Sequence, residues 1–282
     1  MNSIKLWRLS RPRFWIYVFG PYIVGLVAAT PSPRHLLSPL VAAFGLFFLF
    51  PANILIYGVN DVFDYETDVR NVKKESYETL LHPPERPALW KIVALTNVPF
   101  LLLLPQTSTR CVLAMCGFLF FSLFYSAPPI RAKSKPILDS AFNVLYIFPG
   151  AFGYFLAGGH NFRVALFVAA WFWAMAMHAY SAVPDISADR EANVPTVATF
   201  LGFYGTLIFC TALYAASALV AFRTLGRLAV VFGLVYIALM WLSLRSDGED
   251  EVRRIYKWFP PVNTLVGFVL FWAIAIARFF RH

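Results

Sequence analysis

The sequence predicts an all-helical protein that crosses a membrane several times. The chain has 282 residues, of which 59% are hydrophobic and only 14% are charged. A typical soluble domain carries about 25% charged residues, so this composition indicates a polytopic membrane protein. The hydrophobic residues also fall into runs close to the roughly 20 residues that a membrane-spanning helix requires.

Nine apolar runs define the predicted spans, and we expect each to form a transmembrane helix. Their approximate ranges are 14–30, 38–60, 89–105, 110–126, 137–157, 163–183, 201–222, 226–244 and 259–279. No linker divides the chain, so we expect a single domain over residues 1–282. The loops after spans two and six are chemically alike, which favours two four-helix repeats at about 14–126 and 137–244, with 259–279 as an added ninth helix.

The basic residues predict the orientation of these spans, because cytoplasmic loops of membrane proteins are enriched in Lys and Arg. If the N-terminus is cytoplasmic, only seven of the 24 Lys and Arg residues fall on the opposite side, namely Arg34, Arg110, Arg163, Arg223, Arg227, Arg278 and Arg281. We therefore expect an integral protein of the cell membrane with a cytoplasmic N-terminus. The same pattern accounts for the net charge of +9 without nucleic-acid binding.

Two clusters of Asp lie at the cytoplasmic ends of spans two and six. The first contains Asp61, Asp64 and Asp68, and the second contains Asp185 and Asp189. On a continuous helix, the members of each cluster would share one face. Carboxylates this close repel one another unless a cation lies between them, and oxygen ligands suit Mg²⁺. The clusters therefore predict an enzyme that binds a diphosphate through magnesium, since both open to the cytoplasmic side, where Mg²⁺ and water-soluble diphosphates are available.

Basic residues near the clusters are the predicted ligands of the diphosphate, because Lys and Arg form charge-assisted hydrogen bonds with phosphate oxygens. They are Lys73, Lys74, Arg131, Lys133 and, at the foot of span one, Arg11. The alternative role of each is to orient the spans and contact lipid headgroups.

Polar and aromatic side chains continue from the clusters into the apolar spans. Polar groups there usually face an interior cavity, with an interhelical hydrogen bond as the alternative. Aromatic ring faces can stabilise a carbocation. We expect the substrate site to include Asn53, Tyr57, Tyr125, Asn143 and His178. Among these, Tyr125 is predicted to assist catalysis, and His178 to accept the final proton or orient water.

Three motifs resemble those of the UbiA superfamily of intramembrane prenyltransferases. They are Asn60-Asp61-x-x-Asp64-x-x-x-Asp68, Tyr125-Ser126-x-Pro128-Pro129-x-Arg131-x-Lys133 and Asp185-x-x-x-Asp189. The resemblance implies nine transmembrane helices around a central cavity that opens sideways to lipid. It also implies a cytoplasmic cap in which the Asp residues hold two Mg²⁺ ions, while Asn60 and the loop Lys and Arg residues contact an isoprenoid diphosphate.

Other segments resemble the lycopene elongase branch of that superfamily. They are residues 10–15, 51–61, 183–191 and 196–202. In that branch the acceptor is a carotenoid end group, so the resemblance implies transfer of a prenyl group such as dimethylallyl to lycopene, with release of pyrophosphate. The chain departs from the branch at Val194-Pro195, outside the metal motif.

Two other functions are compatible with parts of this pattern. An aromatic prenyltransferase acting on a quinone or tetrapyrrole precursor would share the metal motifs, because their spacing does not specify the acceptor. An ion-coupled transporter could also use acidic residues, but transporters place charged sites near the bilayer midplane, whereas these clusters lie at span ends.

Overall fold

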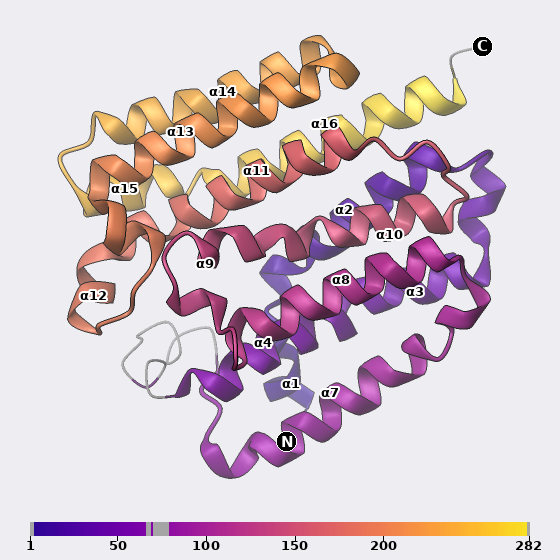
Figure 1. Cartoon of the computed structure of the whole chain (residues 1–282), viewed down its shortest axis with the longest axis horizontal. Coiled ribbons are helices and arrows are strands. Elements are labelled where there is room, and N and C mark those ends of the chain that lie inside the picture. The colour runs from indigo at the N-terminus through magenta and orange to yellow at the C-terminus, as the bar shows by residue number, and fades with distance from the viewer. Residues whose placement is uncertain (1–2, 66–68, 70–78, 281–282) are drawn as a thin grey trace. The chain divides into compact units, whose positions relative to one another are not determined.

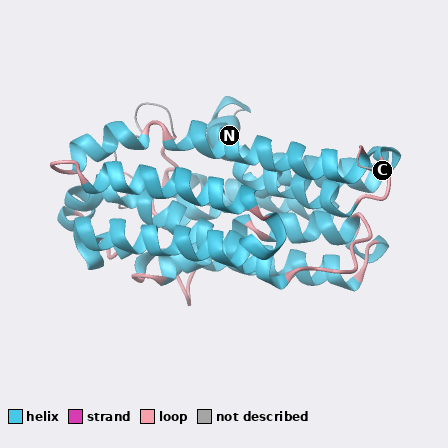
Figure 2. Ribbon diagram, turned by 90° about the horizontal axis from the view of Figure 1, so that it is seen from above, coloured by secondary structure: helices cyan, strands magenta, loops and turns pink. Residues whose placement is uncertain are grey.

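The described part of the chain is entirely helical. The computed structural model describes residues 3–65, 69 and 79–280, and within them no strand occurs (Figure 2). Eight helical stretches of this part are long and apolar enough to cross a membrane. The prediction of an all-helical, polytopic membrane protein is therefore confirmed.

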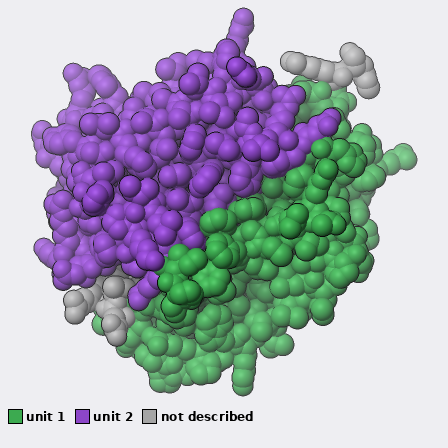
Figure 3. All heavy atoms as spheres, in the orientation of Figure 1, with its two compact units in different colours: residues 1–130, 148–160, 271–282 green, residues 131–147, 161–270 purple. Residues whose placement is uncertain are grey.

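The helices divide into two compact units, coloured green and purple in Figure 3. Unit 1 comprises residues 1–130, 148–160 and 271–282, and unit 2 comprises residues 131–147 and 161–270. The proposed four-helix repeats remain a prediction.

Figure 1 labels the α-helices of both units. Unit 1 contains α1 (Ser3–Leu9), α2 (Trp15–Ala29), α3 (Pro39–Leu49), α4 (Pro51–Phe63), α7 (Arg86–Leu101), α8 (Thr109–Ser126) and α10 (Phe148–Leu156). Unit 2 contains α9 (Leu138–Ala141), α11 (Val164–Ala182), α12 (Ile186–Glu191), α13 (Val197–Leu225), α14 (Arg227–Leu244) and α15 (Glu249–Tyr256). Helix α16 (Phe259–Phe279) contributes residues to both units.

The second predicted span is two helices, because the chain breaks between α3 and α4 at Phe50 and Pro51. Proline has no N–H to continue the helical hydrogen bonds. Side-chain amides compensate: Asn53 Nδ2 donates to the carbonyl oxygens of Phe48 and Leu49 at 3.2 and 2.9 Å. Asn97 Nδ2, from α7, donates to the Pro51 oxygen at 3.2 Å. These hydrogen bonds stabilise the break.

The fifth predicted span is also interrupted, into α9, a 3-10 helix (Phe142–Tyr146) and α10. None of these pieces alone approaches the roughly 20 residues of a straight membrane crossing. Side chains again satisfy the backbone at the interruption. Asn143 Nδ2 donates to the Asp139 carbonyl oxygen, and Trp171 Nε1 donates to that of Ala141, both at 2.7 Å. This span accounts for the difference between nine predicted crossings and eight long apolar helices.

Unit 1 depends on close contact between the backbones of α2 and α10. A Cβ atom at Gly25 would lie 1.9 Å from the carbonyl oxygen of Gly150. Small residues permit such contacts between helices in membranes, where van der Waals packing replaces the hydrophobic effect. Fully buried rings fill the neighbouring space, and those of Phe44 and Phe152 have centroids 4.6 Å apart.

Unit 2 is built around α11, α13 and α14, with buried tyrosines between them. The rings of Tyr214 and Tyr236 stack with centroids 4.6 Å apart. The Tyr236 hydroxyl donates to Asn263 Oδ1 at 2.8 Å, which satisfies a polar group in an apolar core. Helix α13 is kinked at Gly202, whose φ of 71° is readily adopted only by glycine.

We predict that Gly25→Ala destabilises the protein by several kcal/mol, because the added methyl group overlaps a backbone oxygen that cannot move without shifting α10. Gly45→Ala is the matched control, since its Cβ would meet the Tyr22 and Phe19 rings at ordinary distances of 3.5 and 3.7 Å. Thermal unfolding of both variants in detergent measures the effect. Equal melting temperatures for the two variants would contradict this packing.

Candidate functional site

The first Asp motif lies where α4 ends. Asp61 belongs to the last turn of α4, whereas Asp64 follows the helix with φ −111° and ψ 6°. Asp61 and Asp64 therefore do not lie within one continuous helix, because α4 stops at Phe63. Both carboxylates are buried, with 2% and 5% of Asp61 and Asp64 exposed. Asp68 lies outside the described residues.

Arg11 is a basic partner of this motif. Its Nη2 donates to Asp61 Oδ1 at 2.9 Å, and its guanidinium carbon lies 4.8 Å from the centroid of the Tyr57 ring. Two of the predicted substrate ligands, Arg11 and Tyr57, thus meet beside a predicted metal ligand. A buried carboxylate requires such compensation, because desolvation of an isolated charge is costly.

A second contact joins the first motif to the end of α8. Ser126 Oγ donates to Asn60 Oδ1 at 2.9 Å, which links residues that are 66 positions apart. Tyr125 precedes this serine in the last turn of α8 and is partly buried. The structure therefore brings Asn60 and the Tyr125-Ser126 motif together within unit 1.

The second Asp motif also lies at a helix interruption. Helix α11 ends at Ala182, and a 3-10 turn (Val183–Asp185) connects it to α12. Asp185 has φ −115° and ψ 11°, nearly the conformation of Asp64. Asp189 lies inside α12, so the two carboxylates do not share one continuous helix.

Helix α15 supports this second motif through charged contacts that the sequence did not indicate. Arg253 Nη1 donates to Asp185 Oδ1 at 2.9 Å, and its Nη2 donates to the Pro184 carbonyl oxygen. Glu249 accepts a hydrogen bond of 2.7 Å from the Ser187 hydroxyl. In the sequence, these contacts could have been suspected only from the short charged segment between spans eight and nine, whose basic residues also fit the predicted orientation of the spans.

The predicted basic loop begins unit 2. Arg131 has φ 44°, in the left-handed region, and precedes a 3-10 helix (Ala132–Ser134) that contains Lys133. Arg11 likewise has a positive φ of 50°. Lys73 and Lys74 lie outside the described residues.

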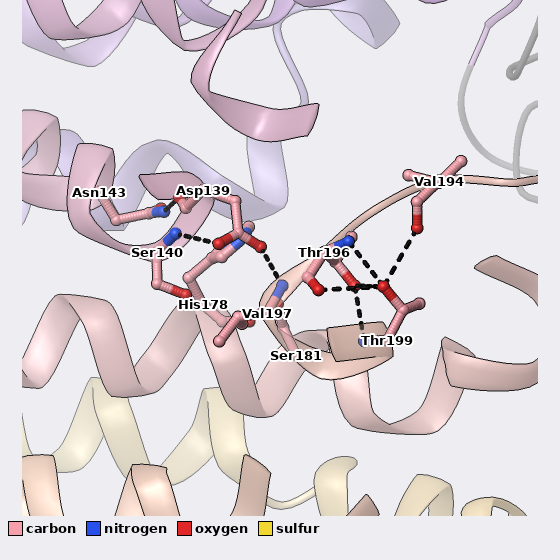
Figure 4. A network of polar contacts seen from close by, with 9 residues as sticks. All are labelled: Asp139, Ser140, Asn143, His178, Ser181, Val194, Thr196, Val197 and Thr199. Carbon is pink, nitrogen blue, oxygen red and sulfur yellow. Dashed lines mark hydrogen bonds and ion pairs between the residues drawn. The ribbon is translucent and has the colours of Figure 1, made fainter. Parts of the chain in front are cut away.

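The polar residues of the apolar spans have different surroundings. Asn53 is fully buried at the α3–α4 break, and its Oδ1 has no hydrogen-bond partner among the described residues. Asn143 is nearly buried and binds the Asp139 backbone. His178 Nε2 lies 3.7 Å from Asp139 Oδ2 (Figure 4). The sequence did not single out Asp139, because one Asp at the start of an apolar run resembles an ordinary span end.

The oxygen ligands of the two motifs fit Mg²⁺. No group of three His, Cys, Asp or Glu residues in the described part of the chain is arranged to hold a metal ion by itself. Mg²⁺ does not require one, because it usually binds one or two carboxylates and completes its shell with water and substrate phosphates. The predicted ligands in each motif are carboxylates, which suit this hard cation.

Comparison with known proteins agrees with this arrangement. The sequence profile of the UbiA prenyltransferase family matches residues 18–259. The chain belongs to this family. It is therefore a UbiA-type prenyltransferase and an integral membrane enzyme, as the sequence predicted, and the transporter alternative is not supported.

Relatives and solved structures extend the comparison. The chain is 41% identical to the lycopene elongase/hydratase of Haloarcula japonica, over 94% of this chain and 88% of that protein. It is 38% identical to the lycopene elongase/hydratase of Halobacterium salinarum, over 94% of each. A UbiA homologue from Archaeoglobus fulgidus bound to GPP and Mg²⁺ has the same fold, with a TM-score of 0.70 and 22% identity, over 96% of this chain and 99% of that one.

We predict that Arg253→Gln loosens the second motif while lowering the free energy of unfolding by no more than about 1 kcal/mol, because the Arg253–Asp185 pair is partly exposed. Hydrogen–deuterium exchange of residues 183–191 should become faster. Arg254→Gln is the matched control, since Arg254 is exposed on the same helix. Identical exchange of this segment in both variants would exclude the supporting role of Arg253.

Proposed function

We propose that this UbiA-type enzyme transfers a dimethylallyl group from its diphosphate to a carotenoid such as lycopene and releases pyrophosphate. The main support for this proposal is sequence similarity. The chain is 41% identical, over most of both chains, to a protein named as a lycopene elongase/hydratase. The segments that resemble this branch include Asp61 of the first Asp motif and the whole of the second motif. The proposed location is the cell membrane, with the N-terminus and both motifs on the cytoplasmic side.

We assign metal binding to the Asp residues of the two motifs, namely Asp61, Asp64, Asp68, Asp185 and Asp189. Mg²⁺ bound there would neutralise the charge of the pyrophosphate leaving group. Lys73, Lys74, Arg131 and Lys133 would bind diphosphate oxygens through charge-assisted hydrogen bonds. Arg11, which holds Asp61, is placed to exchange that contact for a phosphate oxygen.

Backbone conformation supports these assignments. Asp64 and Asp185 both adopt the sparsely populated bridge region, where many active-site residues lie. Arg11 and Arg131 have positive φ angles, a conformation that costs about 1–3 kcal/mol for residues other than glycine. Such strain tends to persist at functional sites, because the surrounding structure holds the residue in place.

The acceptor would enter from the bilayer. Moving a long polyene through water costs roughly 25 cal/mol for each Å² of apolar surface exposed. A lipophilic acceptor that diffuses sideways from the membrane avoids this cost. The Tyr125 ring, at the end of α8 beside the contact between Ser126 and Asn60, is placed to stabilise the allylic cation. The Tyr57 ring already carries the Arg11 guanidinium on its face, which favours substrate positioning over cation stabilisation.

Pigment analysis tests the acceptor. Expression of the chain in a lycopene-producing host should yield carotenoids heavier by one or two prenyl units, detected by mass spectrometry. Membranes from the same cells, supplied with dimethylallyl diphosphate, should leave 4-hydroxybenzoate unmodified. Prenylation of the phenolic acid with unchanged lycopene would refute the carotenoid proposal and favour the aromatic prenyltransferase.

The metal ligands can be tested separately from the acceptor. We predict that Asp64→Asn and Asp185→Asn each lower pyrophosphate release by more than the roughly 10–100-fold that loss of an outer metal partner costs. Both variants should still insert and purify as a single species, because the amide keeps the shape of the side chain. Asp247→Asn, in an exposed loop, is the control. Near-normal turnover in either motif variant would overturn the metal assignment.

A further inference from the structure

Asp139 is a buried carboxylate at the meeting point of three helices of unit 2. Its side chain has no exposed surface. Oδ1 accepts a hydrogen bond from the Ser140 amide, and Oδ2 accepts one from the Val197 amide at the start of α13, each at 2.8 Å. His178 of α11 approaches Oδ2 through its Nε2 at 3.7 Å (Figure 4). The carboxylate is therefore held on two sides by backbone groups while it faces an imidazole.

The His178 side chain is partly exposed, unlike the Asp139 carboxylate that it faces. Its exposed fraction is 20%, although the residue belongs to an apolar span. Polar side chains in such spans almost always face the protein interior or a cavity, since contact with lipid is unfavourable. A base whose ring is oriented by a fixed carboxylate is the arrangement that many enzymes use for proton transfer.

The position of His178 along the helix matches the carbon end of a bound donor. His178 lies seven residues before Asp185, along the end of α11 and the 3-10 turn that follows it, which corresponds to roughly 12 Å. A diphosphate held at Asp185 occupies the first part of this distance, so the carbon atoms that react lie near the level of the imidazole.

We propose that His178 accepts the proton released in the last step of the reaction and that Asp139 is the positioning residue that orients its ring. The proposal rests on the proposed function. After pyrophosphate leaves, the electron pair of an acceptor alkene forms the new C–C bond and leaves a tertiary carbocation. A water oxygen then forms a C–O bond to that carbon. One O–H bond of the resulting oxonium breaks, the oxygen keeps the electron pair, and the proton passes to the imidazole.

The imidazolium formed in this step would be stabilised by the Asp139 carboxylate, 3.7 Å away. Without this pair, the cation would instead lose a proton from a neighbouring carbon to another base, for example the released pyrophosphate, and form an alkene. The pair would thus decide between a hydrated and an unhydrated product. The word hydratase in the names of the relatives describes such a product for those proteins.

The test compares products made by the full-length protein in membranes that contain lycopene and dimethylallyl diphosphate. His178→Gln, Asp139→Asn and the double variant are assayed for the ratio of hydrated to unhydrated elongated carotenoid. We expect each single variant to lower this ratio by roughly 100-fold, the lower end of what a positioned acid or base contributes. This ratio should fall by a larger factor than the rate of pyrophosphate release. The double variant should resemble His178→Gln, because both changes disable one unit.

His160→Gln, an exposed histidine outside unit 2, is the control and should match the wild type. A merely structural Asp139 would lower all products together and leave their ratio unchanged. An unchanged ratio in folded His178→Gln overturns the proposal even if Asp139→Asn fails to accumulate. Unhydrated product alone from the wild type overturns it as well. If the wild type makes no elongated carotenoid, the proposed function itself fails, which is a distinguishable result.

Discussion

Backbone polar groups inside a membrane must find partners within the protein, and this constraint governs how the chain arranges its helix interruptions. Lipid offers no hydrogen bonds to a free carbonyl or amide. Spans two and five both break, and at each break a side-chain amide supplies the missing bonds, from Asn53 in one case and from Asn143 in the other. Asp139 does the same for the first amide of α13. Polar residues in these spans therefore stabilise irregular backbone.

The spans could be predicted from the sequence because the thickness of the membrane requires apolar runs of about 20 residues, and such runs are visible in the sequence. Seven predicted spans correspond to single helices, from α2 to α16. The two interrupted spans could not be recognised in this way, since an apolar run looks the same whether or not its backbone is continuous. The same limit affected the Asp motifs: residue spacing implied a shared helical face, but α4 ends at Phe63, between Asp61 and Asp64. Spacing identifies the cluster and does not determine where a helix stops.

The residues that the sequence did not reveal act through partners far along the chain. Asp139 meets Val197 across 58 positions, and Arg253 meets Asp185 across 68. Neither residue belongs to a recognisable motif, and each resembled an ordinary charge at a span end or in a loop. Only the folded chain supplies their partners. For a charged residue near the end of an apolar run, the sequence therefore does not show whether it orients the span in the membrane or contacts a functional group. The tertiary structure is required to distinguish these two roles.

In both Asp motifs, an arginine compensates the negative charge of a carboxylate. Each has an aspartate that follows or begins a helix in the bridge conformation, and each has one carboxylate paired with an arginine at 2.9 Å, through Arg11 in unit 1 and Arg253 in unit 2. An arginine can neutralise a carboxylate in the free protein and can equally bind a phosphate oxygen, because its planar donors fit both groups. Arg11 and Arg253 therefore compensate the negative charge of the two motifs in the free protein. Under the proposed function, a diphosphate would compete with Asp61 for Arg11, so the same arginine would serve both the fold and the substrate.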